Sequence, residues 1–245
     1  MLEQAIQKYL ERHGFGKFTP KAVLFDMDGV LYDSMPHHAI AWRESMKRFG
    51  ITMPPMGAYQ YEGMRGVETI QLLAREQQGK ELSEEEAQMM YDVKSAIFME
   101  LGGARQMPGI IDLMHAMHDT GITIGVVTGS GQRTLIGKLT TEFDGLILPS
   151  HIVTSYDVKR GKPLPDPYLM GLRKCGVQPW EAIVVENAPL GVRAGVAAQI
   201  FTVAVNTGPL DDNILSREGA NLVLHDMHQF LRLWQTEFCE YNKKQ

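Results

Sequence analysis

The chain has 245 residues, of which 44% are hydrophobic and 22% are charged, with a formal net charge of −5 and a pI near 5.9. This is the composition of an ordinary globular protein, long enough for one large domain or two smaller ones. The acidic balance and the lack of a Lys/Arg-rich stretch argue against a nucleic-acid partner.

The two cysteines, Cys175 and Cys239, show no spacing typical of a zinc site or a disulfide framework, which fits a reducing compartment. The N-terminal segment carries Glu3 and Glu11 and no long apolar run, so it does not match a secretory signal. No apolar stretch is long enough to cross a membrane. We therefore expect a cytoplasmic protein without a membrane partner and, as the default for its architecture, a monomer.

Residues 2–12 show a helical pattern, with Leu2, Ile6 and Leu10 on one face. We expect residues 1–20 to form an N-terminal helical extension. Packing against the body of the protein is favoured over binding a partner.

Short apolar runs rich in β-branched residues then alternate with helical patterns. The expected strands are 22–26, 122–127, 151–154, 182–186, 200–205 and 222–224, and the expected helices between them are 109–119, 131–140, 166–175, 189–198 and 226–235. Continuous apolar strands indicate a parallel sheet that is buried on both faces. The sequence therefore predicts an α/β fold with a Rossmann-like, doubly wound parallel sheet.

One segment interrupts the alternation. It contains no convincing strand and three helical patterns, at 36–49, 66–78 and 83–100. Ser34 is expected to cap the first of these helices. We predict an inserted all-helical domain over 34–105, and a core formed by 21–33 and 106–245. The paired glycines Gly102 and Gly103 make the second connection a candidate hinge.

Polar residues follow the expected strands at their carboxyl ends, where open α/β sheets bind ligands. They are Asp26, Asp28 and Gly29 after the first strand, Thr128, Gly129 and Ser130 after the second, and Glu186 and Asn187 after the fourth, with Lys162 in a nearby loop. Crowded carboxylates need a cation, and carboxylate and amide oxygens suit Mg²⁺. Acids, a hard metal and a lysine together indicate phosphoryl transfer on a small phosphorylated substrate.

The segments FDMDGVLYDS, VVTGS, GKPLPDPY and VVENAPLG follow the order of the four motifs of the haloacid dehalogenase-like phosphatase superfamily, which the chain resembles from residue 20 onward. The helical insert resembles the cap of its β-phosphoglucomutase-like group. The segments EG at 62–63, VVTGSGQ and FTVAVNTGPLD add a likeness to an inorganic pyrophosphatase of that group.

The resemblance implies a role for each motif residue. Asp26 attacks phosphorus and forms an aspartyl phosphate, while Asp28 acts as general acid and base, and its carbonyl binds Mg²⁺. Lys162 neutralises charge. Thr128, with the N–H groups of Gly129 and Ser130, holds the phosphoryl oxygens.

The metal site is implied to include Asp26 and Asp28, with Glu186 and Asn187 bound directly or through water. Asn187 departs from the usual Glu-Asp motif, and it removes one negative charge from the metal site.

Four residues of the insert are candidates for substrate binding: His38, Glu62, Lys94 and Arg65. Each has a plainer alternative, which is a helix-surface position for His38 and Lys94 and a solvated loop position for Glu62. The role of Arg65 is left open.

The insert also bears on the choice of reaction. A β-phosphoglucomutase carries a phosphate-clamping arginine three residues after the loop glycine, where this chain has Gly66. Glu62 would repel a sugar phosphate but could help to hold a metal-bound pyrophosphate. We therefore favour an inorganic pyrophosphatase. The alternatives are a β-phosphoglucomutase, a broad sugar-phosphate phosphatase and, more remotely, a non-catalytic phosphate-binding module.

Overall fold

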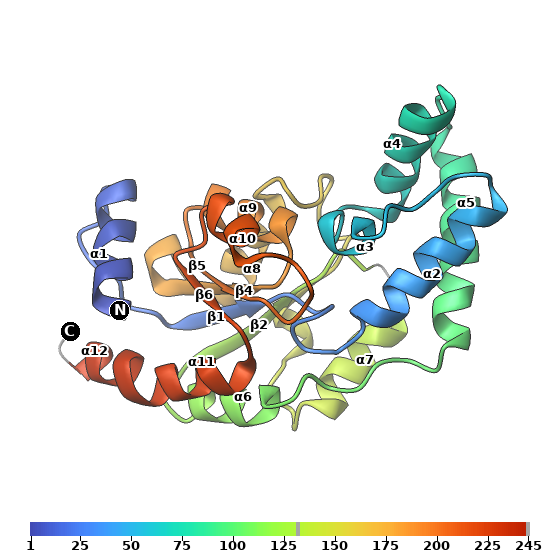
Figure 1. Cartoon of the computed structure of the whole chain (residues 1–245). Helices are drawn as coiled ribbons and strands as arrows, with labels where there is room; N and C mark the ends of the chain where they lie inside the picture. The colour runs from blue at the N-terminus through green and yellow to red at the C-terminus, as the bar shows by residue number, and fades with distance from the viewer. Residues whose placement is uncertain (131–132, 244–245) are drawn as a thin grey trace.

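The structure is a computed structural model that describes residues 1–130 and 133–243 (Figure 1). Six parallel strands form one sheet in the order β3-β2-β1-β4-β5-β6. These are β1 (Ala22–Phe25), β2 (Thr123–Val127), β3 (Ile152–Val153), β4 (Ala182–Glu186), β5 (Phe201–Val205) and β6 (Leu222–Leu224). The strand that precedes Asp26 pairs with β2 on one side and β4 on the other, in the middle of the sheet. The predicted doubly wound α/β fold is confirmed.

Helices cover both faces of the sheet, because successive side chains of a buried strand point to opposite faces. Val23 and Phe25 pack in one cluster, whereas Leu24 packs in another. The first face is covered by α6 (Ile110–His118), α7 (Arg133–Glu142) and α11 (Met227–Leu233), and the second by α8 (Asp166–Cys175) and α9 (Pro189–Ala197). The short 3-10 turns η1 (Pro149–His151) and η2 (Pro179–Glu181) lead into β3 and β4.

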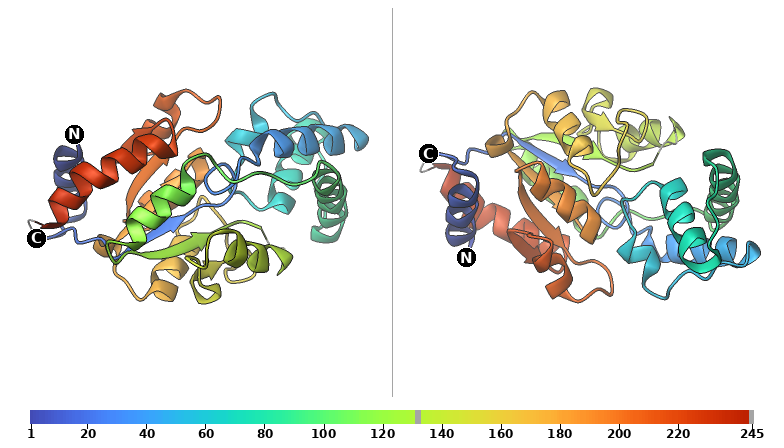
Figure 2. Two further views of the ribbon diagram at one scale, coloured as in Figure 1. Left: turned by 90° about the horizontal axis from the view of Figure 1, so that it is seen from below. Right: turned by 90° about the horizontal axis from the view of Figure 1, so that it is seen from above.

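The insert after β1 consists of helices with a hydrophobic cluster of their own, which includes Trp42, Met46 and Ile70. The helices are α2 (Met35–Arg48), α3 (Gly57–Gln60), α4 (Gly66–Gln78) and α5 (Glu84–Glu100). We call residues 34–105 the cap segment. It lies at one end of the sheet, and both chain termini lie at the other (Figures 1 and 2).

The N-terminal helix α1 (Leu2–His13) packs on the main body of the protein. Leu2, Ile6 and Tyr9 are buried in the larger core cluster, and the Tyr9 hydroxyl donates to the carbonyls of Pro179 and Gln199. The helix ends at Gly14, which has a left-handed backbone (φ 67°). This arrangement agrees with the favoured packing role of the extension.

The structure differs from the sequence expectations at a few elements. The expected helix at 131–140 corresponds to α7, and residues 131 and 132 lie outside the described part of the chain. The last helix continues past 235 through a π-helical turn, η3 (Trp234–Phe238), into α12 (Cys239–Lys243), because Trp234 and Phe238 are both buried against the core. The short helices α3 and α10 (Asp212–Arg217) were not expected. Across the described residues, none of the helices has the length and apolar character needed to span a membrane.

Candidate active site

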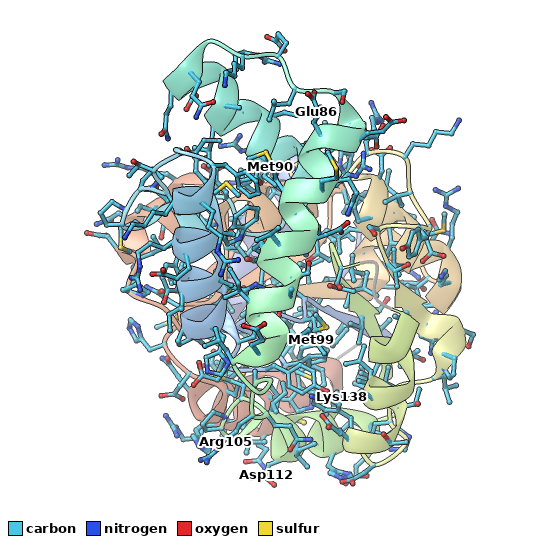
Figure 3. The ribbon with its side chains drawn as sticks, turned by 90° about the vertical axis from the view of Figure 1, so that its right-hand side faces the viewer. Glu86, Met90, Met99, Arg105, Asp112 and Lys138 are labelled. Atoms are coloured by element: carbon cyan, nitrogen blue, oxygen red, sulfur yellow. The ribbon has the colours of Figure 1, made fainter. Side chains whose placement is uncertain are left out.

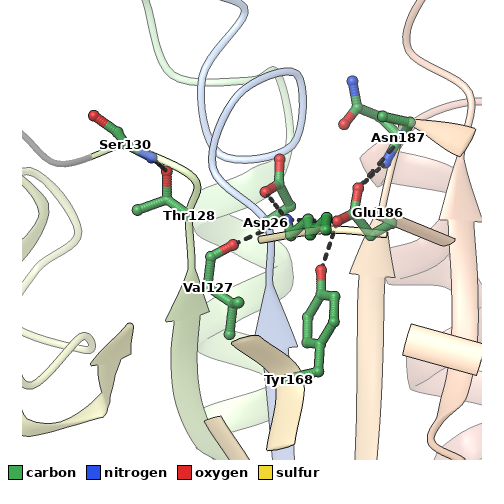
Figure 4. A network of polar contacts seen from close by, with 9 residues as sticks. Asp26, Val127, Thr128, Ser130, Tyr168, Glu186 and Asn187 are labelled. Atoms are coloured by element: carbon green, nitrogen blue, oxygen red, sulfur yellow. Dashed lines mark hydrogen bonds and ion pairs between the residues drawn. The ribbon is translucent and has the colours of Figure 1, made fainter. Parts of the chain in front are cut away.

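The carboxyl ends of β1, β2 and β4 bring the predicted core residues together around Lys162 (Figure 4). The Lys162 side chain is buried, and its ammonium group donates to the Asp26 carboxylate. It also donates to the Val127 carbonyl at 3.2 Å and to Glu186 Oε1 at 2.7 Å. One ammonium group therefore serves two carboxyl groups, and these two acids hold the pKa of Lys162 above its usual range although burial would lower it.

Glu186 has a different place from the expected metal ligand. Its Oε1 accepts from Lys162 and from the Tyr168 hydroxyl, at 2.7 and 2.6 Å, and its Oε2 accepts from the main-chain N–H groups of Asn187 and Ala188. Gly191 in α9 makes room for this carboxylate, since a Cβ there would lie 1.9 Å from Oε1. Because both oxygens already have donors, Glu186 positions Lys162 and has little capacity left for direct metal binding.

Two buried oxygen atoms at this edge of the sheet have no hydrogen-bond partner: Asp26 Oδ2 and Asn187 Oδ1. A buried acceptor without a donor is costly unless a cation or water meets it. Gly29 (φ 80°) lies directly beneath the Asn187 amide, where a Cβ would approach Nδ2 to 2.1 Å. A hard cation such as Mg²⁺ fits a carboxylate oxygen and an amide oxygen that are both unpartnered.

The metal set implied here differs from a cluster of acidic or histidine side chains. Within the described residues, no group of three or more His, Cys, Asp or Glu side chains is arranged to hold a metal ion. Asp26, Asn187 and the main-chain carbonyl of Asp28 would be the ligands. Burial and the neighbouring Glu186 raise the pKa of Asp26 to about 8, so a cation at this position would also favour its ionised form.

The loop after β2 provides the other side of the site. The Thr128 hydroxyl accepts from the main-chain N–H of Ser130 at 3.0 Å, which shapes the turn (Figure 4). Gly129 and Ser130 both line the main cavity, while Thr128 is almost completely buried beneath them. This places hydroxyl and N–H groups opposite Asn187 across the end of β1.

Asp28 is held from the cap side. Its Oδ1 accepts from the Ser34 hydroxyl at 2.6 Å and lies 3.1 Å from His38 Nε2. The Lys94 ammonium lies 2.7 Å from His38 Nδ1. An ammonium can only donate, so Nδ1 accepts and Nε2 carries the hydrogen that it donates to Asp28. Burial alone would raise the pKa of Asp28, but these groups lower it to about 2.

Ser34 is therefore a site residue that the sequence analysis missed. It occupies the N-cap position of α2, as expected, but its hydroxyl makes no capping hydrogen bond and instead binds Asp28. Tyr168 is a second missed residue, since it holds Glu186. The signal for Tyr168 was its place on the helix that directly follows the lysine loop.

Lys94 is buried, with 3% of its surface exposed, and not on the solvent-facing side of α5. Its ammonium lies 5.2 Å from the centre of the Trp42 ring, 5.5 Å from Tyr91 and 5.3 Å from Phe98. His38 stacks on Phe98 at 4.2 Å. Burial lowers the pKa of Lys94 to about 8. Lys94 and His38 thus form a single donor chain that leads to Asp28.

The cap loop carries Glu62 toward the core carboxylates. Burial raises the pKa of Glu62, and the nearby Asp28 and Asp26 raise it further. Arg65 has a different place: its guanidinium group pairs with Glu84 at 3.3 Å and Glu68 at 3.6 Å, both within the cap segment.

A cavity of about 530 Å³ lies between cap and core. It is lined by Asp28, His38, Glu62, Lys94 and Ser130 of the predicted set, but not by Arg65. Met99 at the end of α5 and Lys138 of α7 line the part of the cavity next to the hinge glycines (Figure 3). Thus the fold brings all the predicted core residues and three of the four cap residues to one site.

Comparison with known proteins agrees with this geometry. Residues 20–199 match the family model of haloacid dehalogenase-like hydrolases. The chain belongs to this family. Over 209 residues it is 34% identical to hexitol phosphatase A of Escherichia coli, covering 85% of this chain and 92% of that protein. It is also similar, at 24% identity, to the beta-phosphoglucomutase of Bacillus subtilis, covering 85% and 94% of the two chains.

Among solved structures, a Bacteroides vulgatus protein provisionally described as a beta-phosphoglucomutase matches with a TM-score of 0.92 and 48% identity, over 96% of each chain. Phosphatases and phosphomutases thus share both the fold and the sequence pattern of this family member. The chain is an enzyme of that kind, and its substrate is addressed next.

Proposed function

We propose that the protein hydrolyses small phosphates with Mg²⁺, through an aspartyl phosphate on Asp26, and that its preferred substrate is inorganic pyrophosphate. The substrate phosphoryl group would lie between Asp26 and the Thr128 loop. Lys162 would balance its negative charge from below.

The chemistry follows from what each residue touches. The free Oδ2 of Asp26 attacks phosphorus, the bond to the leaving oxygen breaks, and the leaving group departs as phosphate. Asp28 then accepts a proton from the water that attacks the acyl phosphate, and the P–O bond to Asp26 breaks. Ser34 and His38 hold the Asp28 carboxylate in position for this step.

Asp26, Asn187 and the Asp28 carbonyl would hold Mg²⁺, as their unpartnered oxygens suggest. When bound, the ion offsets the charge of the phosphoryl oxygens and of the nearby acids. Glu62 would reach the same ion or its waters from the cap.

The observation that carries the choice of pyrophosphate is the pairing of Glu62 inside the cavity with Arg65 outside it. A carboxylate would repel a free sugar phosphate, whereas a metal-chelated pyrophosphate brings its own cations. The arginine that a phosphomutase would need has no room at position 66. A Cβ on Gly66 would lie 2.1 Å from the Tyr91 ring.

The test is phosphate release with Mg²⁺ from a panel of pyrophosphate, hexitol and sugar phosphates and phosphoglycolate, beside a coupled assay for β-glucose 1-phosphate isomerisation. We expect pyrophosphate to lead in kcat/KM by about a hundredfold, which corresponds to about 2.7 kcal/mol of transition-state preference. Rapid isomerisation with negligible pyrophosphate cleavage would overturn the proposal.

A matched pair of variants tests Glu62 itself. Glu62→Gln is expected to lower kcat/KM for pyrophosphate by about a hundredfold and to raise the Mg²⁺ concentration needed for half-maximal rate. Glu85→Gln, an exposed acid on the same cap segment, should change neither. Equal losses for every substrate would assign Glu62 a general structural role.

The second candidate is a phosphatase of sugar or polyol phosphates, as the similarity to hexitol phosphatase A suggests. The cavity volume of about 530 Å³ leaves more room than pyrophosphate requires. On this alternative the leaving group would occupy the part of the cavity beside Met99 and Lys138. The substrate panel separates the two.

A further inference from the structure

The inference concerns how the cap segment is aligned on the core, and it rests on the proposed role of Glu62. Glu62 lies in a short loop between α3 and α4, and its position over Asp26 and Asp28 depends on where that loop meets the core. Three core glycines lie at these contacts: Gly129, Gly161 and Gly208.

The first two contacts flank Glu62 directly. A Cβ added to Gly129 would lie 3.5 Å from the Gly63 carbonyl oxygen, and one added to Gly161 would lie 3.1 Å from Arg65 Cγ. The aliphatic part of Arg65 thus rests on the core, while its guanidinium group pairs within the cap.

The third contact lies outside the catalytic motifs. A Cβ on Gly208 would lie 3.2 Å from Tyr59 Cδ1 and 3.3 Å from Cε1. Gly208 does not have the left-handed backbone that favours glycine, in contrast to Gly29 and Gly63. The absence of a side chain at Gly208 therefore serves close approach and not backbone conformation.

The loop that carries Gly208 is fixed to the active site. The Thr207 hydroxyl donates to the Gly29 carbonyl at 2.6 Å, and the Asn206 amide donates to the Leu210 carbonyl and to Asp212 Oδ1. Gly29 directly follows Asp28. A cap residue that packs on Gly208 is therefore aligned with the catalytic loop itself.

We propose that Tyr59 and Gly208 are positioning residues that set the register between cap and core, so that Glu62 reaches the Asp26–Asp28 site. Displacement of Tyr59 moves the loop that carries Glu62. A misplacement of about 1 Å in a catalytic site can cost about a hundredfold in rate.

The experiment is a double-mutant cycle on the full-length protein. Gly208→Val introduces a clash with Tyr59 and is expected to lower kcat/KM about tenfold, and Tyr59→Ala about threefold. The double variant removes the clash, so its kcat/KM should be no lower than that of Tyr59→Ala alone. Gly16→Val is the matched control, because a Cβ there meets nothing within 4 Å.

Activity is measured on whichever phosphate the wild type hydrolyses fastest, so failure of the pyrophosphate proposal does not decide this one. Amide hydrogen exchange of residues 61–66, without any substrate, gives the second readout. We expect faster exchange in Gly208→Val and recovery in the double variant. Multiplicative losses of about thirtyfold, or exchange unchanged from wild type in Gly208→Val, would overturn the proposal.

Discussion

The two halves of the site are built in different ways. In the core half, Asp26, Thr128 and Glu186 come at the ends of adjacent parallel strands, so the strand register fixes their spacing. In the cap half, Glu62 and Lys94 come from a loop and a helix whose position depends on side-chain packing. The core half therefore provides chemistry common to the family, and the cap half can change the substrate without disturbing the sheet.

The largest expected effect is on the core side. Asp26→Asn removes the nucleophile and should lower kcat at least about a thousandfold for every substrate in the panel. Asp112→Asn, on the outer helix α6, should leave kcat unchanged. Retention of activity in Asp26→Asn would remove the distinction between a catalytic core and a selective cap.

A second test of the core half concerns stability. Lys162→Met leaves Asp26 and Glu186 buried without their shared cation, and it should lower the free energy of unfolding by about 3–5 kcal/mol. The loss should shrink as the pH falls, since the two acids can then take up protons. Lys174→Met breaks a more exposed pair with Asp157 and should cost about 1 kcal/mol or less. Urea unfolding at pH 8 and pH 5 measures both.

The cap half should determine the alkaline limb of the pH profile. Lys94 is cationic below its pKa of about 8 and neutral above it, so its attraction for an anionic substrate fades as the pH rises through 8. We expect kcat/KM to fall across this range. Lys94→Met should be about tenfold slower at pH 7 and should lack that limb. The same alkaline limb in the variant would assign it to another group.

The smallest effect is expected for Arg65. Because Arg65 does not line the cavity, Arg65→Gln should change kcat/KM less than about threefold for sugar phosphates and pyrophosphate alike. A large loss for sugar phosphates alone would mean that Arg65 reaches the substrate, and that the cap half works as in a phosphomutase.

The sequence predicted the core half well because one rule applied. Polar residues that follow buried parallel strands converge at one edge of the sheet, so Asp26, Thr128 and Asn187 could be grouped before their positions were known. Glu186 was grouped correctly but assigned a different contact, since sequence alone cannot tell which oxygens are already occupied by Lys162 and Tyr168.

The cap half was harder to predict because its residues act through tertiary contacts. Ser34 can cap a helix or bind Asp28, and only the path of the chain decides between them. Lys94 did have a usable signal: Ala87, Met90 and Ile97 are the buried residues of α5, and Lys94 lies on the same helical face. Arg65 had none, because its direction depends on Glu68 and Glu84.

The contact between Gly66 and Tyr91 has a consequence for how substrate preference can change in descent or by design. An arginine cannot be introduced at position 66 while the Tyr91 ring occupies that space. A single substitution toward a phosphomutase-like clamp would thus pass through a poorly packed intermediate. The two positions have to change together, or the tyrosine has to change first, which places a barrier between closely related activities on one scaffold.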